Sequence, residues 1–141
     1  MKAFLDTNVL VAVFYGDHPH HDASLSLFVR FAKRDVSCGA HSLVEVYAAL
    51  TRMPGRQRIS GEQAMLFVHN IRERLTVVGL TADEYAEALD RFAGLGVVGG
   101  AIYDGMLARC ALKARAEKLF TWNARHFEQF GPEIARLLDT P

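Results

Sequence analysis

The chain has 141 residues, half of them hydrophobic, with 16 Lys and Arg against 16 Asp and Glu and a formal net charge of zero. This length and apolar content are sufficient to bury one hydrophobic core, so we expect a single domain over residues 1–141. The balanced charge excludes a uniformly basic, histone-like protein, and any contact with nucleic acid must come from local basic patches.

The cysteines and the apolar runs exclude further classes. Cys38 and Cys110 lie far apart and lack the paired Cys or His spacing of a zinc site, so we expect neither a disulfide framework nor structural zinc, and a reducing setting. No run approaches the roughly 18 apolar residues that a membrane helix needs, and the N-terminus lacks the pattern of a signal peptide. We therefore expect a cytoplasmic protein with no membrane contact.

Short apolar segments alternate with helical patterns along the chain. Four of them are brief, largely apolar or β-branched, and bounded by turn or helix signals, as buried parallel strands are. These predicted strands are residues 2–5, 35–38, 76–79 and 117–121. The alternation predicts an α/β fold in which helices cover both faces of a short parallel sheet.

The segments between the strands are predicted helices. Ser42 is a plausible N-cap for a helix through Leu50, because Glu45 follows three residues later in the pattern of a capping box. This helix must end before Pro54. Apolar residues also recur at helical spacing in residues 61–75, 82–93 and 103–116.

Asp6 closes the first predicted strand, at the point where a helix follows. Ligands of open parallel sheets bind beyond the carboxyl ends of strands, so Asp6 is a candidate ligand for a metal or a phosphate site. Helix capping is an alternative, since Asp6 or Asn8 could begin the helix that runs through Phe14.

Three more polar residues lie in apolar settings. Glu45 is flanked by valines, Asp104 lies at the start of a helix, and Asn123 follows the last predicted strand. Helix capping could explain each of them. Together with Asp6 they could instead converge on one Mg²⁺, which takes several oxygen ligands, whereas clustered carboxylates without a cation would raise one another's pKa.

Four motifs in this order resemble the PIN-domain nucleases, especially the VapC-type toxins of toxin–antitoxin systems. They are Asp6-Thr7-Asn8-Val9-Leu10, Glu45 in its apolar helix, Tyr103-Asp104-Gly105-Met106-Leu107-Ala108, and Thr121-Trp122-Asn123-Ala124-Arg125-His126-Phe127. The resemblance spans nearly the whole chain. It implies a three-layer sandwich around a parallel sheet of four or five strands, and an acidic pocket that binds Mg²⁺ or Mn²⁺ and cleaves RNA.

The resemblance also implies a role for each matched residue. Asp6 and Asp104 would be the principal metal ligands, and Glu45 a further acidic member of the pocket. The supporting residues would be Thr7, Asn8 and Thr121. Asn123 stands where this family often has Asp, so its amide is expected to weaken a second metal site or to position only a water.

The function we expect from these assignments is a metal-dependent endoribonuclease, the toxin of a type II toxin–antitoxin pair, which cleaves RNA by metal-activated water. A small antitoxin would occlude the pocket, and a homodimer is implied by kinship. Arg109, Lys113 and Arg125 are the candidate contacts to the RNA backbone. The alternative is a degenerate PIN-like domain that binds RNA or protein without cleavage. An aspartate-nucleophile phosphatase is disfavoured because Asn8 stands where its second Asp would be.

Three aromatic features of the sequence have structural interpretations that do not require a catalytic role. His18, His20 and His21 lie too close together in one turn to surround an ion readily. The resemblance to PIN domains, in which similar His-Pro segments occur, implies that this segment is a helix entry. Trp122 is expected to lie in the core or the pocket wall. His126 is expected to be a packed residue or a helix-capping residue.

Overall fold

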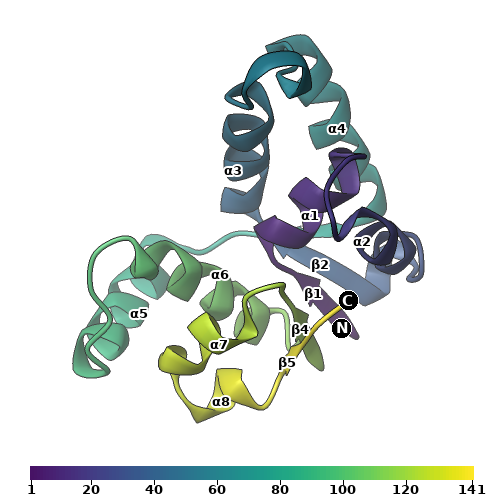
Figure 1. Cartoon of the computed structure of the whole chain (residues 1–141). Helices are drawn as coiled ribbons and strands as arrows, with labels where there is room; N and C mark the ends of the chain where they lie inside the picture. The colour runs from purple at the N-terminus through teal and green to yellow at the C-terminus, as the bar shows by residue number, and fades with distance from the viewer.

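The computed structural model describes residues 1–141 and has a five-stranded parallel sheet with helices on both faces (Figure 1). The strands are β1 (Ala3–Leu5), β2 (Val36–Gly39), β3 (Thr76–Val78), β4 (Lys118–Phe120) and β5 (Leu138–Asp139). Their order across the sheet is β3-β2-β1-β4-β5. The predicted α/β sandwich is confirmed, and four strands lie within one residue of their predicted ends, whereas β5 was not located from the sequence.

Eight helices connect and flank the strands. They are α1 (Thr7–Phe14), α2 (His21–Phe28), α3 (Ala40–Thr51), α4 (Gly61–Arg74), α5 (Ala82–Gly94), α6 (Ala101–Lys113), α7 (Ala124–Phe127) and α8 (Pro132–Ala135). Short 3-10 turns lie at Lys33–Asp35, Gly55–Gln57 and Glu128–Phe130. None of the helices has the length and apolar character that crossing a bilayer requires.

The two faces of the sheet bury two separate cores. Side chains alternate along a strand, so Ala3 and Leu5 of β1 point into one core while Phe4 points into the other. Helices α1 to α4 cover the first core, and α5 to α8 cover the second (Figure 1). Strands β1 and β2 are therefore buried on both sides, which explains why they are largely apolar.

The start of α3 differs from its prediction. Its N-cap is Gly39, the last residue of β2, and no side chain caps it, so the predicted capping box of Ser42 and Glu45 is wrong. Strand β2 runs directly into the helix without a loop, and the helix begins at Ala40, before the serine is reached. The side chains of Ser42 and Glu45 are consequently free for contacts with α1.

Gly39 marks a close approach between β2 and α6. A Cβ at this position would lie 2.6 Å from Leu107 Cδ2 and 3.6 Å from Phe4 Cζ, both in the buried core. Gly39→Ala is expected to lower the free energy of unfolding by about 1–3 kcal/mol, because the added methyl overpacks this contact. Urea denaturation measures the change. Gly16→Ala is the control, since a Cβ there meets nothing within 4 Å; an equal loss in both variants would contradict the packing argument.

Candidate active site

A cavity of about 300 Å³ opens at the carboxyl ends of β1 and β4. The strand order reverses between these two strands, which is where ligands of open α/β sheets bind. The cavity is lined by Asp6, Thr7, Asn8, Val11, His18, Glu45, Asp104, Asn123 and Phe127. The structure thus brings all four candidate catalytic residues to one place, from segments far apart in the sequence.

Asp6 is both a helix cap and part of the cavity wall. Its side chain is only 3% exposed, and Oδ1 accepts a hydrogen bond from the backbone N–H of Thr7 at 2.8 Å at the start of α1. Burial chiefly, and the charges of Asp104 and Glu45 to a smaller extent, raise the pKa of Asp6 to about 7 despite the opposing hydrogen bonds from Thr121 and Thr7. The capping and the ligand interpretations of Asp6 are therefore compatible.

Thr121 holds the second oxygen of Asp6. Its hydroxyl donates to Asp6 Oδ2 at 2.8 Å, and it accepts from Asn8 Nδ2 at 3.2 Å and from the Asn123 backbone N–H at 3.0 Å. The other end of the Asn8 amide, Oδ1, accepts from the Trp122 backbone N–H at 3.1 Å. The donor and both acceptor positions of the buried Thr121 hydroxyl are thereby used, and Asp6 is fixed in one orientation.

Glu45 approaches the cavity from α3. Its Oε1 accepts a hydrogen bond from the Thr7 hydroxyl at 3.0 Å, and the same hydroxyl lies 2.8 Å from Ser42 Oγ. The side chain is partly buried and lines the cavity, so this contact orients the carboxylate and leaves Oε2 without a hydrogen bond. Ser42 and Glu45 thus act on Thr7 of a neighbouring helix rather than on the start of their own.

Asp104 is the fourth residue of α6, whose N-cap is Gly100, so the capping interpretation of Asp104 is wrong. Its Oδ2 lies 3.0 Å from His126 Nε2. Partial burial raises the pKa of Asp104, and His126 opposes that rise. The ring of His126 also packs edge-on against Phe127 and Phe130, so the predicted packing role is only part of its contacts.

Sequence reasoning did not identify His126 as a partner of Asp104. The available signal was its place three residues after Asn123, because residues at that spacing share one helix face. Asn123 itself is the N-cap residue of α7 by position, but its side chain makes no capping hydrogen bond. Its amide is exposed at the cavity and is free for another partner.

The chemistry of the cavity fits a hard divalent cation. Three carboxylates and two amides line it, and no Lys or Arg lines it to balance the negative charge. The neighbouring carboxylates add to the effect of burial in raising the pKa of Asp6. No three His, Cys, Asp or Glu side chains are close enough together to hold an ion by themselves. This arrangement suits Mg²⁺, which is commonly bound through one or two carboxylates and keeps several waters.

Two of the three candidate RNA contacts have other partners. Lys113 Nζ lies 2.6 Å from Glu84 Oε1, Arg109 lies 3.5 Å from Glu84 Oε2, and neither lines the acidic cavity. The hydrogen bond from Lys113, followed by those from Thr81, lowers the pKa of Glu84 to about 2. Arg125 lies exposed on α7 without an ion pair, so it is the candidate whose charge is left for a phosphate.

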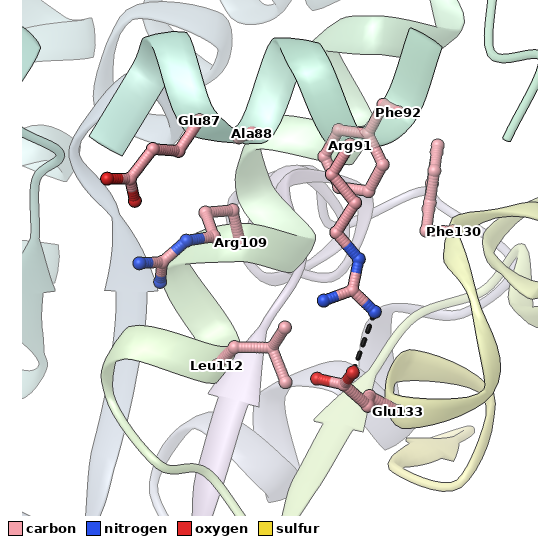
Figure 2. A pocket seen from close by; sticks show the side chains of 8 residues that line it. All are labelled: Glu87, Ala88, Arg91, Phe92, Arg109, Leu112, Phe130 and Glu133. Atoms are coloured by element: carbon pink, nitrogen blue, oxygen red, sulfur yellow. Dashed lines mark hydrogen bonds and ion pairs between the residues drawn. The ribbon is translucent and has the colours of Figure 1, made fainter. Parts of the chain in front are cut away.

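Arg109 lines a different cavity, of about 330 Å³, between α5, α6 and α8. Figure 2 shows Arg91 pointing toward Glu133, with which it forms an ion pair of 2.7 Å, and Phe92 and Phe130 together at one end. Two Arg and two Glu residues line this cavity, so their charges balance. This cavity therefore lacks the surplus of carboxylates that distinguishes the cavity around Asp6.

Comparison with known proteins identifies relatives along nearly the whole chain. The profile of the PIN domain family matches residues 3–131. Ribonuclease VapC40 of Mycobacterium tuberculosis is 36% identical over 125 residues, which cover 89% of each chain. Ribonuclease VapC27 of the same species is 30% identical over 134 residues, which cover 92% of this chain and 93% of the relative.

Solved structures with the same fold include two from toxin–antitoxin systems. VapBC2 from Rickettsia felis, bound to a DNA fragment from its promoter, aligns with a TM-score of 0.67 at 20% identity and covers 99% of this chain and 98% of that one. VapC20 of Mycobacterium tuberculosis, a toxin that cleaves the sarcin-ricin loop, aligns with a TM-score of 0.67 at 18% identity, over 84% and 87%. The sequence relatives and the matched profile together establish that this chain belongs to the PIN domain family.

Proposed function

We propose that this chain is a single-domain endoribonuclease, that it is the toxin of a type II toxin–antitoxin pair, and that it requires Mg²⁺ or Mn²⁺. The observation that carries the proposal is the meeting of Asp6, Glu45 and Asp104 at one cavity beyond the carboxyl ends of β1 and β4. RNA as the substrate is supported by two relatives named as ribonucleases, at 36% and 30% identity.

Asp6 and Asp104 would hold the cation, with Glu45 beside them. When bound, a divalent cation supplies positive charge that stabilises the phosphoryl oxygens and makes water a stronger nucleophile at neutral pH. Such an ion would also lower the pKa of Asp6, because it offsets the burial and the neighbouring carboxylates that raise it.

The protein's own contribution is to orient these carboxylates before RNA arrives. Asp6 is held at both oxygens, by the Thr7 N–H and the Thr121 hydroxyl, so it cannot rotate away from the cavity. Asp104 is held by His126 Nε2. Glu45 Oε1 is held by Thr7, and this leaves Oε2 to accept the proton of the attacking water.

The partners follow from the same proposal. An antitoxin protein would cover the acidic cavity, and kinship with proteins named VapC supports it. Exposed apolar side chains such as Val44 (60%) and Leu66 (67%) are consistent with a protein partner or a second copy in a homodimer. Two cysteines that stay free fit the cytoplasm, where RNA is also found.

The proposal is tested by incubating the purified protein with mixed-sequence RNA and with DNA of the same sequence, in Mg²⁺, Mn²⁺ or EDTA. We expect fragments from RNA only, and only with a divalent cation. Binding of RNA without fragments in any buffer would favour the degenerate domain that does not cleave. Fragments formed in EDTA would overturn the requirement for a metal.

Asn123→Asp tests whether the amide limits metal binding. The change adds a fourth carboxylate to a cavity lined by Asp6, Glu45 and Asp104, so the Mg²⁺ concentration for half-maximal cleavage at pH 8 is expected to fall by roughly 3- to 10-fold. A magnesium titration of the cleavage rate measures it. Asn70→Asp, on the exposed surface of α4, is the matched control for the added charge. An unchanged half-maximal concentration would mean that residue 123 does not contact the ion.

A further inference from the structure

Four aromatic rings follow one another from the turn after α1 to the end of β4. They are Tyr15, His18, His20 and Trp122, which we call the aromatic ladder. Tyr15 and His18 lie edge to face at 6.0 Å, and His18 and His20 are tilted at 5.6 Å. His20 stacks flat on Trp122, with ring centroids 3.7 Å apart and an angle of 7° between the planes.

The Trp122 end of the ladder is rigid. Trp122 Nε1 donates to the buried Ser24 Oγ at 2.9 Å, and the Trp122 backbone N–H donates to Asn8 Oδ1 at 3.1 Å. Trp122 therefore presents a fixed ring on which His20 rests. The second of these hydrogen bonds also links the ladder to Asn8, which lines the acidic cavity.

His20 is exposed, and its ring makes no hydrogen bond or ion pair in the structure. Trp122 covers one face of the ring. The other ring close to His20, that of His18, is tilted by 43° and does not stack on it. A flat, exposed ring held by a flat stack beneath it is the arrangement by which proteins bind unpaired bases.

His18 connects the ladder to the cavity. It lines the cavity together with Asp6 and Asp104, and its Nδ1 accepts a hydrogen bond from the His20 backbone N–H at 3.0 Å. This contact places the ring proton of neutral His18 on Nε2. Through His18 the ladder thus borders the cavity where the scissile phosphate would lie.

The charge around the ladder selects for a base rather than a phosphate. Asp17, in the turn after α1, and Asp22, in the first turn of α2, flank the histidines and are both exposed. They disfavour a phosphate there, whereas a base is uncharged and every base has a flat face that can stack.

We propose that His20, supported by Trp122, is a stacking platform for one unpaired RNA base next to the scissile phosphate. This inference rests on the proposed nuclease function and specifies its substrate: the RNA must be single-stranded at this nucleotide, since a base inside a duplex already stacks on its neighbours. His20 is accordingly a positioning residue that binds substrate without taking part in the chemistry.

The test compares His20→Ala, His20→Phe and the parent protein in two assays. Binding of short fluorescein-labelled RNA is measured by anisotropy in the Asp104→Asn background, so that the RNA stays intact, and cleavage is measured with Asp104 present. His20→Ala is expected to weaken binding and to raise KM by about tenfold with kcat nearly unchanged. His20→Phe is expected to retain both, because a phenyl ring also stacks.

An abasic scan of the same RNA separates stacking from a loosened turn. Removing one base at a time should reveal a position where the parent protein loses about tenfold in affinity and His20→Ala loses none. A weakened turn would instead lower the affinity for every RNA alike. His69→Ala, on the exposed surface of α4, is the control for loss of a surface histidine.

Each outcome decides the inference. Equal sensitivity of the parent and His20→Ala to every abasic position would overturn it and would leave the nuclease function standing if cleavage persists. Tight binding of a blunt duplex, with no preference for single strands, would also overturn it. Failure of the unmodified protein both to bind and to cleave any RNA would reject the nuclease function itself.

Discussion

Asp104→Asn and Asp6→Asn are each expected to lower the rate of RNA cleavage in Mg²⁺ by about 10³-fold, because each removes one of the two carboxylates proposed to hold the cation. Stabilisation of the phosphoryl charge by a bound metal amounts to several kcal/mol, which corresponds to that factor. Both changes keep the size and shape of the side chain. Single-turnover cleavage of a labelled RNA measures the rate.

The matched control for these two substitutions is Asp83→Asn, an exposed aspartate in the first turn of α5, away from the cavity. It is expected to leave the rate within about twofold of the parent, as surface changes usually do. Circular dichroism checks that all three variants are folded. A rate that survives in both Asp6→Asn and Asp104→Asn would place the chemistry elsewhere or identify a contaminating nuclease.

The central sheet could be predicted because its strands are buried on both faces. Such strands are largely apolar: β1 is wholly apolar, and β2 and β4 each contain one polar residue, Ser37 and Lys118. The position of Asp6 followed from the same signal, since a carboxylate directly after an apolar run lies at the end of a strand. Whether that end borders the crevice depends on the strand order, which a single sequence does not reveal.

The contacts of side chains were harder to predict than the elements that carry them. Lys113 and Arg109 appeared as free positive charges because Glu84 is 29 and 25 residues away in sequence, and only the packing of α5 on α6 brings the three together. His126 was taken as a packed residue for a related reason. Its ring does contact Phe127 and Phe130, and only the three-dimensional arrangement adds Asp104.

The strand β5 was missed because it comprises only Leu138–Asp139 and carries no apolar run of its own. It pairs with β4 through backbone hydrogen bonds, such as the one from Thr121 N–H to Asp139 O at 3.1 Å. Backbone pairing of this kind depends on where the chain returns to the sheet edge, and no residue type signals it.

Asp6→Asn is expected to stabilise the metal-free protein at pH 8, although it destroys the proposed site. The pKa of Asp6 is about 7 in the folded protein against 3.8 for an ordinary Asp, chiefly because it is buried. Between these two values the folded state holds a proton that the unfolded state has released. The free energy of unfolding therefore falls as the pH rises from about 4 to about 7, and the loss is complete above that range.

An amide cannot ionise, so the variant avoids this loss. The gain has a limit, because the Asn side chain can accept a hydrogen bond through only one oxygen, whereas Asp6 accepts from both the Thr7 N–H and the Thr121 hydroxyl. Losing one such bond costs about 1 kcal/mol, against a gain of a few kcal/mol from the pKa shift. We expect a net rise in Tm of roughly 3–8 °C at pH 8 in EDTA.

Thermal unfolding from pH 4 to pH 8, with EDTA or with Mg²⁺, tests this account directly. In EDTA the difference in Tm between Asp6→Asn and the parent should increase from about pH 4 to about pH 7 and then level off, whereas the control Asp90→Asn, on the exposed surface of α5, should follow the parent. Magnesium should raise the Tm of the parent most at pH 8, where Asp6 is ionised. It should raise the Tm of Asp6→Asn much less, because an ion that binds the folded state stabilises it more the tighter it binds. A parent protein whose Tm is independent of pH in EDTA would mean that burial does not raise the pKa of Asp6. A magnesium effect of equal size in both proteins would mean that Asp6 is not a ligand of the ion. The same carboxylate that weakens the metal-free fold is thus expected to supply its affinity for the cation.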